Sequence, residues 1–282
     1  MTIAVTAATG QLGQKIVAQL LDRVPASEVV AVVRNPEKAA PLAARGVDVR
    51  VADYTDRAAL TEAFAGVDKV VLISSNEVGQ RSTQHRNVID AAKDAGVNYI
   101  AYTSLLGADS SPLQLAAEHV ETEQALEQSG IAHSFLRNGW YHENQASAID
   151  PARATGSLLT SAGDGRVASA SRDDFAEAAA VVVTSASPET VYELSGDVAW
   201  TTAELADALS QAIGAPVAVA QVDAEQHRAA LAQAGLDDGT IDFVVSIDRD
   251  IAAGALSATP GTLSALIGRP TTPLVDTLRT LV

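Results

Sequence analysis

The chain has 282 residues, of which 47% are hydrophobic, and this size allows one large or two modest domains with a substantial core. Its 35 acidic and 19 basic residues give a formal net charge of −16, which argues against nucleic acid and anionic membranes as partners. The absence of cysteine excludes disulfides, thiol nucleophiles and thiolate metal sites. No apolar stretch is long enough to cross a bilayer, and Met1 runs into the first strand without a leader, so we expect a soluble cytoplasmic protein.

The first part of the sequence predicts a strand, a glycine-bearing turn, a helix and a second strand. An apolar run at residues 3–6 is followed by the turn Ala7 to Gly13 and then by apolar residues at helical spacing. The second strand covers residues 29–33 and is followed by Arg34. Small residues before a helix N-terminus let its backbone N–H groups and partial positive charge reach a diphosphate. This βαβ unit therefore predicts a dinucleotide site.

Two positions in this unit bear on which dinucleotide is bound, and how tightly. Arg34 stands where a Rossmann fold that prefers NAD carries Asp or Glu. A guanidinium favours the 2′-phosphate that a carboxylate would repel, so Arg34 predicts a preference for NADP(H) over NAD(H). The alternative interpretation of Arg34 is a solvated turn residue. Ala7 replaces the usual first glycine, and its methyl group is expected to weaken cofactor binding if this position needs a positive φ or touches the diphosphate.

Strands and helices then alternate regularly. Further helices are predicted over residues 37–44, 57–64, 80–95 and 113–128, and further strands over residues 47–51, 69–73, 99–103 and 131–136. Asp56 is expected to cap the helix that begins at Arg57, and Ser129-Gly130 to end the helix before the sixth strand. The alternation predicts a Rossmann-type, doubly wound parallel sheet with helices on both faces, in which ligands lie at the carboxyl ends of the strands.

The residues that follow the predicted strands are therefore the candidates for a binding groove. They are Ala7 to Gly13, Arg34, Asp53-Tyr54, Ser74 to Glu77 and Thr103 to Leu105. The sixth strand ends in an unusual segment, Arg137-Asn138-Gly139-Trp140-Tyr141-His142-Glu143-Asn144. Its two aromatic rings beside an amide predict a wall for a flat, unsaturated ligand, and the alternative is an aromatic cluster that seals the join between two domains.

The alternation weakens from about Pro151. We expect a Rossmann domain at residues 1–150 and a smaller, mainly helical lobe at residues 151–282 that covers the substrate, unless the chain passes back into the Rossmann sheet. Gly163-Asp164-Gly165 predicts a hairpin between strands at 158–162 and 167–170. Further helices are expected at 172–183 and, with a capping box at Thr201 and Glu204, up to Ala212, and further strands at 190–194 and 217–222.

Several of these segments together resemble the bacterial type 2 NAD(P)H:quinone oxidoreductases, which belong to the NmrA-like group of atypical short-chain dehydrogenases/reductases. The resemblance is carried by the glycine loop, Val33-Arg34-Asn35-Pro36, Ile73-Ser74-Ser75, Gln84-His85-Arg86-Asn87-Val88, residues 101–106 and residues 136–141. It extends over essentially the whole chain. The sequence is also similar to the triphenylmethane-dye reductases of the same group.

The resemblance implies NADPH in the groove and a planar quinone as the acceptor. The chain can form a homodimer, and the sequence leaves its oligomeric state open. It implies a diphosphate on Ala7, Ala8, Thr9, Gly10, Gln11, Leu12 and Gly13, and a 2′-phosphate on Arg34. Ser74, Ser75 and Asn76 would follow the adenosine and ribose. Asn138, Gly139, Trp140 and Tyr141 would border the nicotinamide, with Arg172 as a weaker cofactor contact.

The Tyr-x-x-x-Lys pair of carbonyl-reducing short-chain dehydrogenases is missing, because no tyrosine has a lysine four residues later and no lysine lies beyond Lys93. A quinone needs less help, since hydride addition gives a stabilised hydroquinone anion that water can protonate. Three residues are candidates to assist: Asn138 and Tyr141 as hydrogen-bond donors, and His119, which would titrate near neutrality. The alternative for His119 is a solvated helix histidine. The five histidines lack ligand spacing, so no metal site is expected.

Two other functions fit the same residues. One keeps the cofactor and replaces the quinone by a triphenylmethane or azo dye. The other is a non-catalytic, NADP(H)-sensing NmrA-like regulator, which the missing Tyr-x-x-x-Lys pair and Ala7 would suit.

Overall fold

The computed structural model describes residues 1–282, and the contacts between residues divide the chain into two compact units. The first unit comprises residues 1–110, 114–138 and 172–194, and the second comprises residues 111–113, 139–171 and 195–282. Both units are therefore built from separate stretches of the sequence. The domain boundary expected near residue 150 stays a prediction.

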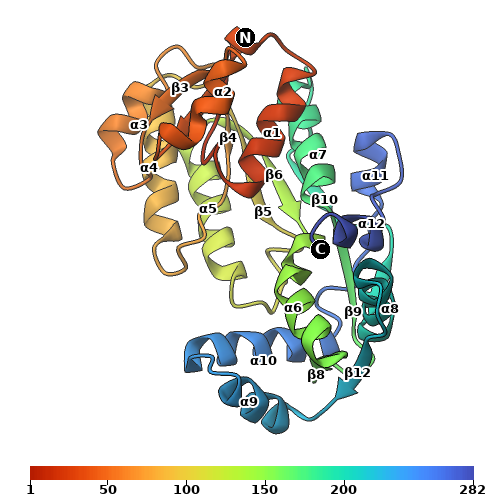
Figure 1. Cartoon of the computed structure of the whole chain (residues 1–282). Helices are drawn as coiled ribbons and strands as arrows, with labels where there is room; N and C mark the ends of the chain where they lie inside the picture. Colours follow the sequence, from red (N-terminus) through yellow and green to blue (C-terminus); the bar gives the residue numbers. More distant parts are fainter. The chain divides into compact units, whose positions relative to one another are not determined.

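The first unit is built on a seven-stranded parallel sheet with the strand order β10-β6-β5-β4-β1-β2-β3 (Figure 1). Its strands are β1 (Ile3–Val5), β2 (Val29–Val33), β3 (Asp48–Val51), β4 (Lys69–Leu72), β5 (Tyr99–Leu105), β6 (Ala132–Asn138) and β10 (Val191–Leu194). The strand order changes direction beside β1, where a doubly wound sheet opens its ligand-binding crevice. The predicted Rossmann-type fold is confirmed.

Helices cover both faces of this sheet. They are α1 (Gln11–Leu21), α2 (Ala40–Ala44), α3 (Arg57–Ala63), α4 (Arg81–Asp94), α5 (Ala116–Ser129) and α7 (Arg172–Thr184), with 3₁₀ turns η1 (Ala26–Glu28) and η2 (Glu37–Ala39). On one side α1 packs against α7, and on the other α3, α4 and α5 pack in a row (Figure 1). Strands β1, β2 and β5 are buried along their whole length because both faces are covered, which explains their continuous apolar runs.

The helix cap and the helix end that the sequence predicts in the first unit are confirmed. The side chain of Asp56 caps α3 by accepting a hydrogen bond from the backbone N–H of Ala59, and Gly130 ends α5 in the left-handed conformation. The helix expected at 37–44 is a 3₁₀ turn followed by the short helix α2.

The second unit contains two small sheets and the remaining helices. One sheet has the order β11-β9-β7, and β8 pairs with β12 in the other. The strands are β7 (Trp140–Tyr141), β8 (Ser157–Thr160), β9 (Arg166–Ala170), β11 (Ala199–Thr201) and β12 (Ala218–Gln221). The helices are η3 (His142–Gln145), α6 (Ala146–Thr155), α8 (Thr202–Ile213), α9 (Ala224–Gln233), α10 (Asp238–Ala252), α11 (Thr262–Ile267) and α12 (Leu274–Arg279). The capping box of Thr201 and Glu204 is confirmed.

The predicted hairpin around Gly163 is wrong. Strands β8 and β9 flank the turn but belong to different sheets, since β8 pairs in parallel with β12 and β9 pairs with β11 and β7. The turn therefore sends the chain from one sheet to another. Helix α6 was not predicted because Pro151 lies inside it, and proline disfavours helix interiors.

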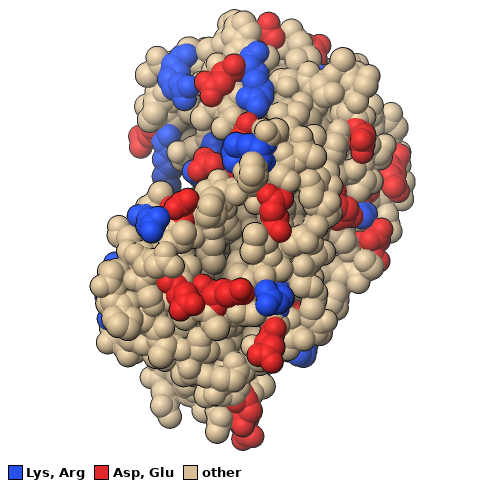
Figure 2. Space-filling view, turned by 90° about the vertical axis from the view of Figure 1, so that its right-hand side faces the viewer, with Lys and Arg blue, Asp and Glu red and all other residues tan.

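Acidic and basic side chains are mixed on one face of the molecule (Figure 2). On the face shown in Figure 2, acidic and basic side chains lie close to one another and neither sign occupies the face alone. An anionic ligand must therefore be attracted by local groups, against the net charge of the whole chain. No helix combines the length and the apolar character that a membrane span requires.

Candidate functional site

The glycine-bearing loop links β1 to α1 and is tightly constrained. Ala7 has a φ of +47° and is the one non-glycine residue of the chain with a positive φ. Its carbonyl oxygen accepts a hydrogen bond of 2.8 Å from the backbone N–H of Gly10, which closes the turn. The position where the family usually carries glycine thus does require the left-handed conformation, which costs an alanine on the order of 1–2 kcal/mol.

Gly13 lets the first turn of α1 approach this loop. A Cβ atom on Gly13 would lie 2.3 Å from the carbonyl oxygen of Ala7 and 2.8 Å from the Cα of Ala8, whereas one on Gly10 would lie 3.1 Å from the same oxygen. Gly10 is the N-cap of α1, has no side-chain capping bond, and is followed by no acidic residue in the first turn. The N-terminal N–H groups of α1 are therefore left for an anionic ligand.

The entrance to the loop is fixed by Tyr54, which follows β3. Its hydroxyl donates a hydrogen bond of 2.8 Å to the carbonyl of Ile73 and contacts the hydroxyl of Thr6, which in turn accepts from the N–H of Ile73. Burial raises the pKa of Tyr54, so it stays a neutral hydrogen-bonding group. These bonds hold the residue before Ala7 against the end of β4.

Arg34 follows β2 at the carboxyl edge of the sheet, and its side chain is 69% exposed. Its Nη1 lies 3.3 Å from Oε1 of Glu77, and its Nε lies 3.9 Å from Oδ2 of Asp53. The pKa of Asp53 is lowered, first by hydrogen bonds from Thr55 and also by Arg34. The guanidinium is therefore accessible to a ligand but already faces two carboxylates.

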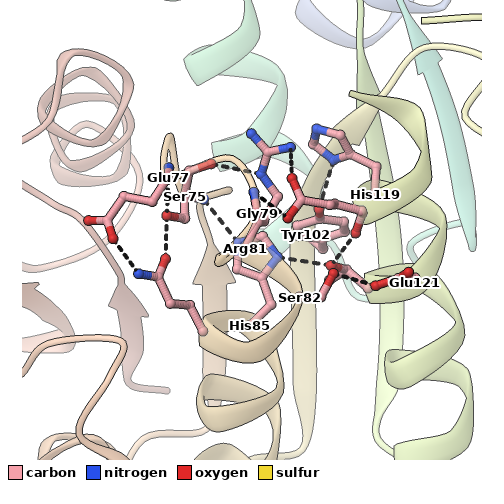
Figure 3. A network of polar contacts seen from close by, with 12 residues as sticks. Ser75, Glu77, Gly79, Arg81, Ser82, His85, Tyr102, His119 and Glu121 are labelled. Atoms are coloured by element: carbon pink, nitrogen blue, oxygen red, sulfur yellow. Dashed lines mark hydrogen bonds and ion pairs between the residues drawn. The ribbon is translucent and has the colours of Figure 1, made fainter. Parts of the chain in front are cut away.

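The loop that follows β4 is held by a network of polar contacts from α4 and α5 (Figure 3). The backbone of Ser75 donates to Nε2 of His85 at 2.9 Å, and its carbonyl accepts from Nε of Arg81 at 2.7 Å. Glu118 accepts from the N–H of Gly79 and pairs with Arg81 at 3.4 Å. Ser74 is tied separately, through its N–H, to the hydroxyl of Thr103. The backbone of candidate residues Ser74 and Ser75 is thus fixed by hydrogen bonds.

Two buried histidines belong to this network. His85 Nδ1 lies 2.9 Å from the hydroxyl of Thr122, and His119 Nδ1 lies 2.7 Å from the hydroxyl of Tyr102 (Figure 3). Burial, with a further contribution from Arg81, lowers the pKa of each histidine to about 3. Both are neutral at pH 7. The expectation that His119 titrates near neutrality is wrong, and so is its interpretation as a solvated helix residue.

A buried ion-pair cluster lies at the ends of β5, β6 and β10, and sequence reasoning missed it. Arg137 donates two hydrogen bonds to Glu123, at 3.0 and 2.7 Å, and one of 2.8 Å to Glu193. Ser104 donates to Glu123 at 2.6 Å, and Glu193 accepts from the N–H of Gly107 at 2.8 Å. The pKa of Arg137 is raised, chiefly by its bonds to Glu123. The cluster fixes the loop after β5 beside the end of β6.

The remaining candidates are divided between the two units. Asn138 is the last residue of β6, is buried, and accepts a backbone hydrogen bond of 3.0 Å from Leu106. Arg172 begins α7 in the first unit. Gly139, Trp140 and Tyr141 belong to the second unit, where Trp140 and Tyr141 form β7 and are half-buried. The glycine loop, Arg34 and residues 74–76 share the carboxyl edge of the first unit's sheet.

Comparison with known proteins places this geometry in context. The model of an NAD(P)H-binding family matches residues 7–186. The chain is 52% identical over 277 residues to quinone oxidoreductase 2 of Escherichia coli strain K12, across 98% of this chain and 97% of that protein. The crystal structure of the Escherichia coli NADPH-dependent quinone oxidoreductase complexed with NADPH matches with a TM-score of 0.94 over 99% of both chains. The NADP(H) complex of Citrobacter sp. triphenylmethane reductase matches at 39% identity and a TM-score of 0.93 over 100% of both chains.

Proposed function

Because this chain belongs to the NAD(P)H-binding, NmrA-like family of type 2 quinone oxidoreductases, we propose that it is an NADPH-dependent reductase of planar quinones. The observation that carries the proposal is the uncapped N-terminus of α1 behind the tight turn Ala7 to Gly13, with Arg34 at the end of the next strand. This arrangement offers N–H groups to a diphosphate and a guanidinium to a 2′-phosphate.

The residues fit NADPH in two respects. A Cβ at Gly13 would collide with the loop, so the glycine keeps the approach of helix and loop that a diphosphate cradle needs. The loop that follows β4 is held by α4 and α5 through bonds to the backbone of Ser75 and Gly79. We propose that Ala7, Ala8, Thr9, Gly10, Gln11, Leu12 and Gly13 bind the diphosphate, Arg34 the 2′-phosphate, and Ser74, Ser75 and Asn76 the adenosine and ribose. We assign Asn138, Gly139, Trp140 and Tyr141 to the nicotinamide, with Arg172 as a further contact.

Bound NADPH supplies the hydride, and the protein's part is to orient the acceptor and to stabilise the oxygen that gains negative charge. We propose the side-chain amide of Asn138 and the hydroxyl of Tyr141 as hydrogen-bond donors to that oxygen. His119 is buried behind Tyr102 and neutral, so we assign it the role of positioning Tyr102 in place of proton transfer. Without a Tyr-x-x-x-Lys pair, simple aliphatic ketones should be poor substrates.

The test follows the absorbance of NADPH with purified protein and a panel of benzoquinones and naphthoquinones, with NADH and a no-acceptor mixture as controls. Acceptor-dependent oxidation that prefers NADPH is expected, and Asn138→Ala should lower kcat. Tight binding of NADPH without turnover of any quinone would contradict the proposal and favour the NADP(H)-sensing regulator.

A second candidate function is reduction of triphenylmethane dyes. It is favoured by the 39% identity to the Citrobacter sp. triphenylmethane reductase over the whole chain. Comparing kcat/KM for a quinone and a cationic triphenylmethane dye separates the two acceptors.

We further propose that the protein acts in the cytoplasm and as a homodimer. The cytoplasmic assignment is supported by the use of NADPH and by the lack of cysteine. Light scattering should give twice the chain mass of 29.0 kDa.

A further inference from the structure

Arg34, the proposed 2′-phosphate contact, already has an acidic partner from a distant part of the sequence. Oε1 of Glu77 lies 3.3 Å from Nη1 of Arg34, and the two side chains are 47% and 69% exposed. Asp53 lies farther away, at 3.9 Å from Nε. A 2′-phosphate that binds Arg34 must therefore share the guanidinium with a carboxylate, or displace it.

Glu77 is held in this position by neutral groups. Its Oε2 accepts a hydrogen bond of 2.7 Å from the side-chain amide of Gln84, and its backbone N–H donates to the hydroxyl of Ser75 at 3.2 Å. The hydroxyl of Ser75 in turn donates to the side-chain carbonyl of Gln84. In Figure 3, Glu77 lies at one end of this network and Glu121 at the other. One carboxylate oxygen is thus anchored, while the other faces Arg34.

The anchoring reaches into the buried part of the unit. Arg81 and His85, which bind the backbone of Ser75, are 5% and 0% exposed. These contacts restrict Glu77, so its side chain cannot swing away as freely as an ordinary surface glutamate.

We propose that Glu77 is a specificity-determining residue that competes with the 2′-phosphate of NADP(H) for Arg34 and so limits the preference over NAD(H). NAD(H) carries a hydroxyl at this position, and its binding does not require Arg34 to leave Glu77. The inference rests on the proposed role of Arg34. Because both side chains are more than a third exposed, solvent screens the competition, and we expect an effect of about 3- to 10-fold on affinity.

The test compares dissociation constants for NADPH and NADH in the full-length wild type, Glu77→Gln, Arg34→Ala and the double variant. Glu77→Gln keeps the bond to Gln84 through its carbonyl oxygen and removes only the charge. It should tighten NADPH by about 3- to 10-fold at low salt, change NADH by less than about 2-fold, and lose its effect at about 0.5 M NaCl. Glu62→Gln, an exposed carboxylate on α3, is the control for loss of one negative charge.

The outcomes separate this inference from the proposed function. If Arg34→Ala abolishes the preference for NADPH but Glu77→Gln affects both cofactors equally, the inference is overturned and the cofactor site stands. An equal gain from Glu77→Gln in the Arg34→Ala background would also overturn it, because the carboxylate would then act without Arg34. If Arg34→Ala leaves the NADPH/NADH ratio unchanged, the assignment of Arg34 itself is wrong. Thermal unfolding of each variant reports whether the fold is intact.

Discussion

Replacing Ala7 by glycine removes a methyl group from a left-handed position, and the structure allows the two opposing effects to be weighed. At a φ of +47° an alanine is strained by about 1–2 kcal/mol relative to glycine. The added glycine also gives the unfolded chain more conformational entropy, which opposes stability by about 0.4–1 kcal/mol. We therefore expect a net stabilisation of between zero and about 1.5 kcal/mol, or a rise in Tm of up to ~4 °C.

The affinity for NADPH is expected to change in Ala7→Gly for a reason other than the change in stability. A second effect is steric, because the methyl group of Ala7 takes up space in the turn that is proposed to hold the diphosphate. Its removal should tighten NADPH by up to about 5-fold, equivalent to ~1 kcal/mol. Fluorescence titration with NADPH measures the change in affinity, and thermal unfolding without added NADPH measures the change in stability.

The matched control is Ala8→Gly, the same chemical change one residue later. Ala8 is fully buried and has no positive φ, so its replacement loses a buried methyl group and relieves no strain. This variant should lower Tm. If Ala7→Gly lowers Tm as much as Ala8→Gly does, the argument from backbone strain is refuted.

Three further predictions concern the first unit. Gly13→Ala would place a Cβ 2.3 Å from the carbonyl oxygen of Ala7, so α1 must shift. Calorimetric titration should show the affinity for NADPH weakened by more than about 10-fold, and an unchanged affinity would contradict the assignment of the diphosphate to this turn. His119 has a folded-state pKa of about 3, below its unfolded value, so its contribution to stability is present above about pH 6.5 and is lost as the pH falls. Urea unfolding between about pH 4.5 and 7 gives the free energy of unfolding at each pH. This free energy should rise with pH less steeply in His119→Phe than in the wild type, by up to about 1.4 kcal/mol per pH unit, and equal pH dependence would argue against a buried neutral imidazole. Arg137→Met leaves the buried carboxylate of Glu123 without its partner and should cost about 3–5 kcal/mol in urea unfolding, much of it recovered in Arg137→Met/Glu123→Leu; a stable single variant would contradict the cluster.

The sequence was sufficient for six of the seven strands of the first sheet because the strands and helices up to residue 138 alternate and several strands are continuous apolar runs. It did not assign β10 and α7 to the first unit, since both lie beyond the boundary expected near residue 150. Asp56 and Gly130 act on their own neighbours, so their roles can be inferred from a few residues. The hairpin around Gly163 failed for the opposite reason. A turn signal fixes a change of direction but not the partner of each strand, and β12, the partner of β8, lies more than fifty residues further along the chain.

The same limit applies to the site. The glycine loop and Arg34 could be identified because their spacing is part of a known motif. Neither the contact of Arg34 with Glu77 nor the pairing of Arg137 with Glu123 has such a spacing, because both depend on which strands lie next to each other. His119 was misjudged because helix α5 is rich in acids, and its burial against Tyr102 cannot be inferred from that helix alone.

The return of the chain to the first sheet has a consequence for how the protein is made. Strand β10 pairs with β6, α7 packs against α1, and Lys69 donates to the carbonyls of Val183 and Ser185. A nascent chain that has left the ribosome only as far as residue 150 lacks all three contacts, and β6 is then an open edge able to pair with other chains. The seven-stranded sheet can be completed only after residue 194, the last residue of β10, has emerged. Folding of the first unit must therefore wait until part of the second has been synthesised.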